Sequence, residues 1–313
     1  MKQFRNILVT CAGGAGTLDL VRKLRDSFHI FLADGNDQVA ARYCSDLPFR
    51  KIPFGADPAF KQTMHDLSEE WKIDCIVPGA DEELLPLASL REESGVACVL
   101  PERQFIETCL NKKALMEVLQ KKNISGLLPF LKEEDVHFPA IAKPVRGRGS
   151  RQVHRLETDA QLKGYLGVYG KTFSEVLIQP YVDGEEYTIS VIVNNRNCLL
   201  GIVPKRIIEK RGITRVAVSE NSPLITKVCT RIVEELHPCG PFNVQLKIHN
   251  GMCFIFEINP RLSTTAILTE KAFGNEIELY IRYYDRESCA PLPTLRGGVI
   301  MLRHETHCFV DQE

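Results

Sequence analysis

The segment from 242 to 259, FNVQLKIHNGMCFIFEIN, constrains the fold more strongly than any other part of the chain. Polar and apolar residues alternate on both sides of an Asn-Gly pair, which is typical of two antiparallel strands joined by a tight turn. A two-residue loop would mix polar and apolar side chains on both faces. A three-residue loop, 249 to 251, separates Val244, Leu246, Ile248, Phe254, Phe256 and Ile258 from Asn243, Gln245, Lys247, Glu257 and Asn259. We therefore expect the three-residue loop and one polar face.

This polar face has two interpretations. The ordinary one is an antiparallel sheet with one solvated face. The other is a metal site, because oxygen ligands from Gln245, Glu257 and Asn259 would converge at one end of the hairpin. Magnesium typically binds one or two carboxylates and leaves its other positions for substrate phosphates. Pro260 then stops the strand, and Arg261 follows it. The pattern favours a Mg²⁺ site beside a guanidinium group.

A second candidate region, FPAIAKPVRGRGSRQVHR from 138 to 155, has the composition of a phosphate site. Lys143 ends an apolar run, and Gly147 and Gly149 would let backbone amides approach a phosphate closely. The order of residues differs from that of a Walker A loop, and a strand follows where a helix would be required. We expect a mobile flap between two antiparallel strands, with an ordinary hairpin as the alternative.

A third region, VLIQPYVDGEEYTISVIV from 176 to 193, contains a strand with one face toward a ligand. After Gly184 the apolar residues alternate with Glu186, Thr188 and Ser190, which indicates one buried face and one accessible face. Pro180 has no amide proton, so neighbouring backbone groups are left outside a regular ladder. Such groups can hold the edge of an adenine ring. A plain crossover between subdomains is compatible with the same pattern.

The rest of the chain indicates a mixed α/β protein. From 6 to about 108, short apolar runs alternate with helical patterns, which is the signature of a parallel sheet. Helices are expected over 110–122, 223–236 and near 263–273, and strands over 198–203, 242–248 and 252–258. The N-terminal VTCAGGAGTLDL, followed by Asp34, resembles a dinucleotide fingerprint. Its glycine spacing is not GxGxxG, so we do not expect an oxidoreductase.

Composition narrows the class of protein. The 313 residues carry a formal net charge of -1 without a run of lysine and arginine, so no nucleic-acid partner is expected. The sequence offers no apolar run of the roughly 20 residues that a bilayer needs, which predicts a cytoplasmic protein with no membrane partner. Eleven cysteines are scattered singly, many of them in apolar runs, and we expect reduced thiols.

Taken in order, Lys112, AKPVRGRGS, IQPYVDGEEYT, NVQL and FEINPRLS resemble the ATP-grasp superfamily. The likeness is strongest to the synthetase units of the large subunit of carbamoyl phosphate synthetase and to single-domain carboxylate-amine ligases. It implies three units: an α/β pre-ATP-grasp domain over 1–108, a linker helix with a lid subdomain over 109–182, and a core subdomain over 183–313.

The resemblance also implies a role for each matching residue. The phosphates of ATP would be bound by Lys112, with Lys113 as the adjacent alternative, by Lys143, and by a lid of Gly147, Arg148, Gly149 and Ser150. The hinge along adenine would be Gln179, Pro180, Tyr181 and Val182, and Glu186 would bind the ribose hydroxyls. The metal ligands would be Gln245, Glu257 and Asn259, with Arg261 facing the transferred phosphoryl group.

The implied reaction is an ATP-dependent ligation of a small-molecule carboxylate to an amine or ammonia through an acylphosphate, giving ADP and phosphate. ATP is the substrate, two Mg²⁺ ions assist, Mn²⁺ is an expected substitute, and a homodimer is an expected assembly. Arg206 is a candidate for binding the acceptor carboxylate, with a solvated basic strand as the alternative. Pro180 and the neutral Gln245 stand where many relatives have an acid. A catalytically silent ATP-binding sensor or scaffold is therefore the second hypothesis.

Overall fold

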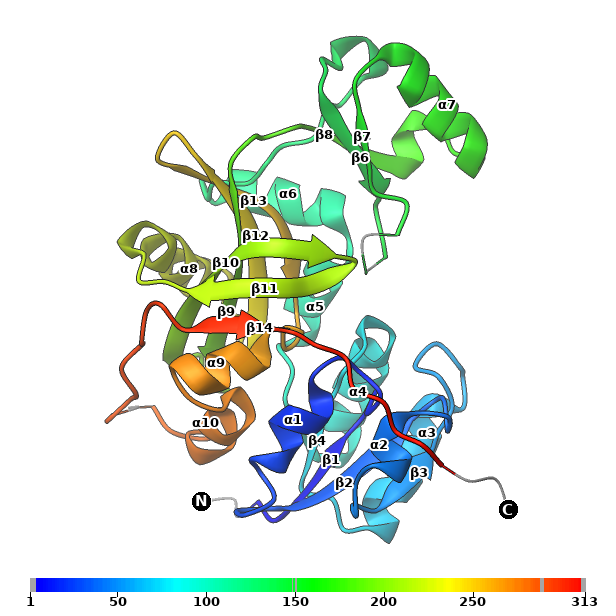
Figure 1. Ribbon diagram of the computed structural model, residues 1–313. Helices are drawn as coiled ribbons and strands as arrows, with labels where there is room; N and C mark the ends of the chain where they lie inside the picture. The colour runs from blue at the N-terminus through cyan, green and yellow to red at the C-terminus, as the bar shows by residue number, and fades with distance from the viewer. Residues whose placement is uncertain (1–3, 148, 150, 288–289, 311–313) are drawn as a thin grey trace.

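The computed structural model describes residues 4–147, 149, 151–287 and 290–310. Among these residues, the strands form three sheets of five, three and six strands (Figure 1). We call them the N-terminal sheet (strands within 6–98), the lid sheet (140–180) and the core sheet (185–302). None of the described helices is long and apolar enough to cross a membrane. The mixed α/β class expected from the sequence is confirmed.

The N-terminal sheet is parallel throughout, with strand order β3-β2-β1-β4-β5. Its strands and helices are β1 (Asn6–Val9), α1 (Thr17–Arg22), β2 (His29–Asp34), α2 (Ala40–Tyr43), β3 (Phe49–Lys51), α3 (Phe60–Glu70), β4 (Cys75–Val77), α4 (Asp81–Ser94) and β5 (Ala97–Cys98). Both faces of the sheet are buried under apolar clusters, as parallel sheets require. Side chains of α3 and α4 cover one face.

Two consecutive helices connect this sheet to the rest of the chain: α5 (Arg103–Leu110) and α6 (Lys112–Lys121). The Asn111 side chain caps α6 by accepting hydrogen bonds from the backbone amides of Lys113 and Ala114. The apolar stripe of α6, including Leu115 and Leu119, packs into the cluster beneath the core sheet. The helix therefore holds Lys112, its first residue, at the edge of that sheet.

The lid sheet is small and antiparallel, with order β7-β6-β8. Its elements are β6 (Ala140–Pro144), β7 (His154–Leu156), α7 (Asp159–Tyr169) and β8 (Val176–Pro180), with two short 3-10 turns at Glu133–Asp135 and Phe173–Glu175. A separate apolar cluster, including Leu162 and Ile178, holds α7 against the strands. In Figure 1 this unit stands at the far end of the molecule from the N-terminal sheet.

The core sheet has the order β13-β12-β9-β10-β11-β14. It comprises β9 (Glu185–Val193), β10 (Leu199–Arg211), β11 (Ile213–Ser219), β12 (Phe242–His249), β13 (Met252–Asn259) and β14 (Ile300–Leu302), with helices α8 (Pro223–Leu236), α9 (Ala266–Ala272) and α10 (Glu276–Arg282). Helix α8 has the bounds that the sequence predicts. Helices α9 and α10 pack against the N-terminal sheet, where the Tyr280 hydroxyl donates to the Cys98 carbonyl at 3.1 Å.

The hairpin of β12 and β13 departs from the expected three-residue loop. His249 pairs with Met252, so the loop contains only Asn250 and Gly251, both with positive φ, as in a type I′ turn. A β-bulge then shifts the register between Gln245 and Leu246, and Gln245 pairs with Glu257. The prediction of the loop was wrong, because the extra residue lies within β13 and not in the turn.

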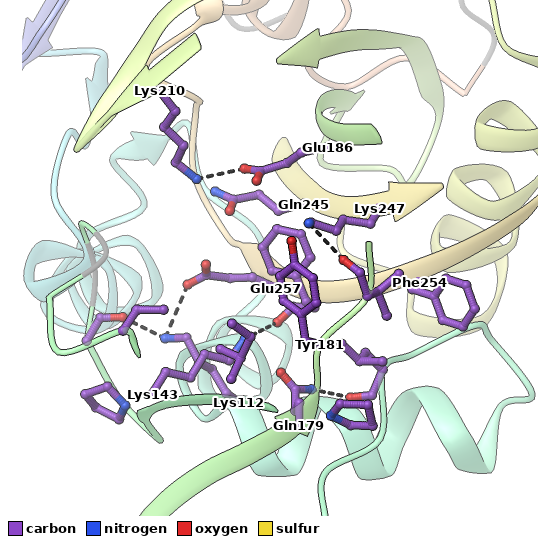
Figure 2. A pocket seen from close by; sticks show the side chains of 18 of the residues that line it. Lys112, Lys143, Gln179, Tyr181, Glu186, Lys210, Gln245, Lys247, Phe254 and Glu257 are labelled. Atoms are coloured by element: carbon purple, nitrogen blue, oxygen red, sulfur yellow. Dashed lines mark hydrogen bonds and ion pairs between the residues drawn. The ribbon is translucent and has the colours of Figure 1, made fainter. Parts of the chain in front are cut away.

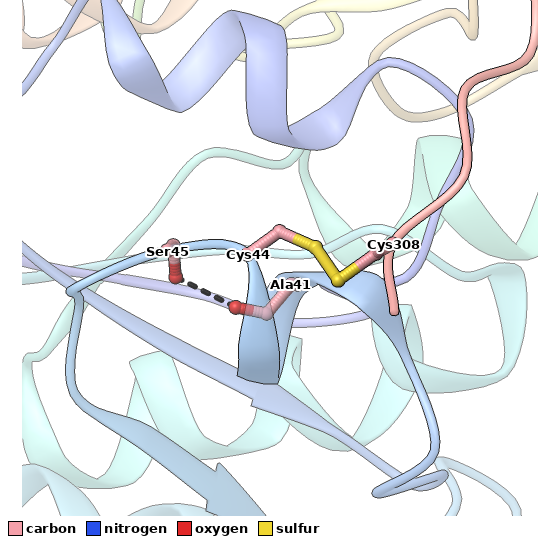
Figure 3. Close-up of a disulfide and its surroundings, with 4 residues drawn as sticks. All are labelled: Ala41, Cys44, Ser45 and Cys308. Atoms are coloured by element: carbon pink, nitrogen blue, oxygen red, sulfur yellow. Dashed lines mark hydrogen bonds between the residues drawn. A yellow bond between two sulfur atoms is a disulfide. The ribbon is translucent and has the colours of Figure 1, made fainter. Parts of the chain in front are cut away.

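The cysteines also depart in part from expectation. Eight of the described cysteines keep their thiol groups, as predicted, but Cys44 and Cys308 form a disulfide (Figure 3). Cys44 follows α2, and Cys308 belongs to the segment after β14, which crosses from the core sheet to the N-terminal sheet (Figure 1). Cys44 and Cys308 are 264 residues apart in the sequence, and the spacing of the cysteines gives no sign that these two lie close together.

Candidate active site

A cavity of about 270 Å³ lies between the lid sheet and the core sheet (Figure 2). Its walls come from α6, β6, β8, β9, β10, β12 and β13. Its lining includes Lys112, Lys143, Gly147, Gln179, Pro180, Tyr181, Val182, Glu186, Lys210, Gln245, Lys247, Phe254, Phe256 and Glu257. All three sequence regions singled out above therefore contribute to one cavity.

Two buried lysines lie at the same end of this cavity. Lys112 Nζ is 3.2 Å from Glu257 Oε1 and donates to the Gly147 carbonyl at 2.7 Å. Lys143 Nζ donates to the Phe256 carbonyl at 2.9 Å. Burial lowers the pKa of Lys143 to about 8, partly offset by the Glu257 carboxylate. Lys113 donates instead to the Ser174 carbonyl, so Lys112 is the residue of that pair that faces the cavity.

The connection between the lid and core sheets forms the opposite wall. Pro180 pairs with Ala140 in the ladder, and the Tyr181 amide donates to the Pro139 carbonyl at 3.0 Å. The buried Gln179 side chain donates to the Leu127 carbonyl. The Tyr181 ring has the Arg155 guanidinium 4.0 Å from its centroid and the Lys247 ammonium 4.8 Å from it.

Lys247 also donates to the Val182 carbonyl at 2.9 Å. This bond ties β12 to the last hinge residue.

A second cavity of about 110 Å³ continues from the first and is mostly polar. Four residues line both cavities: Glu186, Lys210, Gln245 and Glu257. Asn259 and Arg261 line the second. The three predicted oxygen ligands therefore converge on one space.

Their chemistry suits a hard cation, since Glu257 supplies one carboxylate and Gln245 and Asn259 supply neutral amide oxygens. No cluster of three or more histidine, cysteine, aspartate or glutamate side chains was found among the described residues. The donor set thus fits an ion that takes much of its coordination from phosphate.

Arg261 is held in place by the N-terminal unit. Its guanidinium forms an ion pair with Asp81, the first residue of α4, and also donates to the Leu262 carbonyl at 3.1 Å. Both partners of the ion pair are largely buried, with 14% and 15% of their side chains exposed. A third cavity, of about 80 Å³, lies between the glycine-rich loop of residues 14–17 and residues 261–264. Arg261 therefore borders two adjacent cavities.

In the glycine-rich loop, the carboxylate that a dinucleotide site would use to bind a ribose is already occupied by backbone amides. The Asp34 side chain accepts hydrogen bonds from the amides of Gly13 at 2.8 Å and Asn36 at 2.9 Å. The loop uses this aspartate to fix its own conformation. This geometry supports the interpretation that the N-terminal pattern is not a dinucleotide site.

The structure corrects the assignment of Arg206. This residue pairs with Tyr187 across β9 and β10, so the two side chains share a face, and Tyr187 packs in the apolar cluster opposite the cavities. Arg206 Nε lies 2.5 Å from Glu220 Oε1 and 3.6 Å from Glu185 Oε1. It lines neither of the two cavities described above. Its side chain points away from the site because strand residues alternate between faces.

The lid loop is only partly described. Gly147 lines the first cavity and Gly149 the second, while Arg148 and Ser150 lie outside the described residues. Both glycines have positive φ, at 129° and 70°, which few other residues adopt readily.

Sequence reasoning missed Lys210 and Asp81, and it placed Phe254 and Phe256 on the wrong face. Both phenylalanines line the first cavity, whereas Cys253, Ile255 and Ile258 form the core. The two-residue loop explains the position of Phe254, and the β-bulge, which leaves Phe256 unpaired, restores the predicted face for Glu257. The sequence contained no marker of that bulge.

The chain is similar in sequence to several known proteins. Residues 172–306 match the family described as "ATP-grasp in the biosynthetic pathway with Ter operon". The arginine-specific large chain of carbamoyl phosphate synthase from Geobacillus stearothermophilus is 23% identical over 238 residues, which cover 70% of this chain and 23% of that protein. The large chain from Halobacterium salinarum is 25% identical over 239 residues, covering 72% and 22%. The chain thus spans about a quarter of the length of these relatives.

Solved structures show the same fold. An L-amino acid ligase from Bacillus licheniformis matches with a TM-score of 0.70 and 18% identity, over 90% of this chain and 74% of that one. An N5-carboxyaminoimidazole synthetase from Staphylococcus aureus, complexed with ADP, matches with a TM-score of 0.75 and 15% identity, over 96% and 81%. The resemblance to ATP-grasp proteins predicted from the sequence is therefore confirmed.

Proposed function

We propose that this ATP-grasp chain is an ATP- and Mg²⁺-dependent ligase that joins a small-molecule carboxylate to an amine or ammonia. The observation that carries the proposal is the pair of continuous cavities with Glu186, Lys210, Gln245 and Glu257 at their boundary. In the first cavity the buried Lys112 and Lys143 lie at one end, and the Tyr181 ring and the backbone of the hinge lie at the other, as a nucleotide requires. The second cavity is polar and borders Arg261, as a carboxylate substrate with a charged reacting group requires.

The nucleotide would lie along the first cavity. Pro180, Tyr181 and Val182 border the base, and Glu186 accepts hydrogen bonds from the ribose hydroxyls. Lys112 and Lys143 bind the phosphates, because both ammonium groups are buried at the same end and a charge-assisted hydrogen bond to phosphate replaces lost hydration. Gly147 and Gly149 would close over the phosphates as part of the lid.

The residues that would hold Mg²⁺ are Gln245, Glu257 and Asn259, all of which line the second cavity. When bound there, the ion would neutralise charge on the terminal phosphates. Because Glu257 also lies 3.2 Å from Lys112, one carboxylate would serve both the metal and the phosphate-binding lysine. The neutral Gln245 makes binding depend strongly on Glu257 and on ATP itself.

The chemistry follows from this placement. An oxygen of the acceptor carboxylate attacks the γ-phosphorus of ATP, the bond from that phosphorus to the bridging oxygen breaks, and ADP leaves with an acylphosphate formed. The amine nitrogen then attacks the acyl carbon, loses a proton and expels phosphate. Arg261 stabilises the negative charge on the transferring phosphoryl group, and Asp81 keeps its guanidinium oriented.

The test is an assay of ADP release with Mg²⁺ and ATP across pools of carboxylic acids and amines. We expect ADP release that requires both an acid and an amine, together with an amide product in stoichiometric amount by mass spectrometry. Glu257→Gln should abolish release in a protein that still folds, with a lower melting temperature without nucleotide, because the buried Lys112 loses its carboxylate partner. Nucleotide binding without ADP release in any pool would instead favour the silent sensor.

A further inference from the structure

The segment of residues 303–308, which we call the strap, runs from the core sheet to the N-terminal unit (Figure 1). It begins directly after β14, where the Arg303 amide donates to the Arg215 carbonyl at 2.8 Å. It ends at Cys308, whose disulfide partner Cys44 follows the last residue of α2 (Figure 3). The strap therefore joins the two units by hydrogen bonds at one end and by a covalent bond at the other.

The first residue of the strap lies at the rim of the third cavity. The Arg303 guanidinium donates to the Thr214 carbonyl at 3.0 Å and to the Thr264 carbonyl at 2.6 Å. Its Nη1 atom also lies close to Gly16, where an added Cβ would be 3.5 Å away. The third cavity lies between the loops that contain Gly16 and Thr264. Arg303 therefore contacts both walls of that cavity.

The other end of the strap reaches the same cavity through α2. The residue before this helix, Val39, packs tightly on the glycine-rich loop, since a Cβ at Gly13 would lie only 2.6 Å from Val39 Cγ1. The next residue of the loop, Gly14, lines the third cavity. One turn of helix thus separates the disulfide from the residue that supports a wall of the cavity.

Helix α2 is anchored weakly by its own residues. It has four residues, of which only Ala41 is buried. So short a helix is not stable through its own hydrogen bonds. An element with few buried contacts also opens locally at low cost in free energy. The disulfide at Cys44 therefore supplies a large part of the restraint on this helix.

The disulfide is accessible to reductants. Cys308 and its neighbours from 304 to 310 are exposed, and Cys44 is partly exposed. Structural disulfides resist reduction by glutathione, whereas exposed ones belong to the labile and regulatory class. A thiol can therefore reach this bond while the protein stays folded.

The third cavity is connected to the position proposed for the acceptor. Arg261, Ser263 and Thr264 line both the second and the third cavity. Among the described residues, none lines both the first and the third. A change at the glycine-rich wall would therefore affect the acceptor beside Arg261 and leave the nucleotide in the first cavity undisturbed.

We propose that the strap is a redox-sensitive device that controls binding of the acceptor carboxylate. This inference rests on the proposed function. With the disulfide closed, the strap holds α2 and the glycine-rich loop in place as one wall of the third cavity. A dithiol opens the strap: the S–S bond breaks, Cys44 and Cys308 each gain one electron and one proton, and the dithiol becomes a disulfide. The loop then loses its support, and affinity for the acceptor falls.

The first measurement is hydrogen exchange of the wild type oxidised with glutathione disulfide, of the same protein after dithiothreitol, and of Cys308→Ser. Amides of 12–17 and 39–44 should exchange about 10-fold faster or more without the bond, since one disulfide typically contributes at least that factor. Cys308→Ser should match the reduced wild type and should not respond to dithiothreitol. Cys239→Ser is the matched control, because it removes a partly buried thiol and should leave the response unchanged.

The second measurement uses the acid and amine pair that the ADP-release assay identifies. Reduction should raise the KM for the acid several-fold, because only the fraction of protein with an ordered loop binds it. The affinity for AMPPNP with Mg²⁺, measured by calorimetry, should stay unchanged. Cys308→Ser should show the raised KM in both redox states.

Several results would overturn the inference. Exchange of 12–17 that does not change on reduction would remove the strap as a restraint, and so would two thiols at Cys44 and Cys308 after treatment with glutathione disulfide. Equal losses of affinity for AMPPNP and for the acid would contradict a selective effect on the acceptor. No ADP release from any pool would refute the proposed function itself, whereas hydrogen exchange reports on the strap without any turnover, so the two failures are distinguishable.

Discussion

If the buried ammonium of Lys143 binds phosphate as proposed, nucleotide affinity should depend on pH. Burial lowers its pKa from 10.5 to about 8, so at pH 8.5 roughly three quarters of the free protein carries a neutral Lys143. Phosphates bound beside it would favour the charged form and restore a pKa near its ordinary value. Binding of ATP should then take up about 0.1 proton at pH 7 and about 0.75 proton at pH 8.5.

The sign of the effect on affinity follows by linkage. The pKa of Lys143 should be higher in the complex than in the free protein. The affinity for nucleotide should therefore be highest below pH 8 and should fall as the pH rises above 8. The expected weakening is about 10-fold between pH 7 and pH 9. Titration with AMPPNP and Mg²⁺ in buffers of different ionisation enthalpy measures the protons taken up at each pH.

Two variants make this measurement decisive. Lys143→Arg keeps a positive charge that does not titrate in this range, so its proton uptake should vanish even where binding persists. Lys171→Arg changes an exposed lysine of the lid that pairs with Glu175, and should behave as wild type. Proton uptake that remains in Lys143→Arg, or wild-type affinity that is flat from pH 7 to 9, would refute the role of Lys143 in binding phosphate.

Three further predictions test other parts of the site and the packing of the core sheet. Arg261→Ala should change AMPPNP affinity by no more than a few-fold and lower kcat by roughly 10² to 10³, as expected for loss of one preorganised charge. Affinity and ADP release are measured on one preparation, and a loss of affinity as steep as the loss of kcat would contradict this prediction. Amides of residues 145–147 should gain protection from hydrogen exchange when AMPPNP and Mg²⁺ bind, and equal protection without ligand would indicate a static hairpin. Lys205→Met should lower the free energy of unfolding by about 3 kcal/mol, because the buried Glu276 loses a cation linked to it through Ser190; an unchanged urea midpoint would contradict this.

Much of the fold could be predicted because local signals agreed with the final packing. The apolar runs of the N-terminal region, such as Ile7–Val9 and Ile76–Val77, became parallel strands buried on both faces. The α8 helix begins at Pro223 after a Ser222 cap and ends at Leu236, as periodicity and capping residues indicate. Amphipathic periodicity indicates directly which face of an element is buried. These elements could therefore be predicted without knowledge of contacts between distant residues.

The parts that could not be predicted depend on strand phase or on distant segments. Arg206 and Lys210 both lie on β10, yet they face opposite sides because the strand carries register shifts between them. The ion pair of Arg261 with Asp81 joins residues from different units, and no local pattern reports such a contact. Counting residues along a strand gives the right face only as far as the first bulge.

The β12–β13 hairpin shows why the site needs its bulge. A nucleotide requires apolar groups beside its base and polar groups beside its phosphates, and strict alternation along one strand cannot place Phe254, Phe256 and Glu257 on the same face. The two-residue loop sets the phase in which Phe254, opposite Lys247, faces the first cavity. The bulge then reverses the phase, so Glu257 faces the cavity opposite Gln245, and the unpaired Phe256 offers its carbonyl to Lys143. One inserted residue thus joins an apolar half-site to a polar one within the segment FIFEINPR.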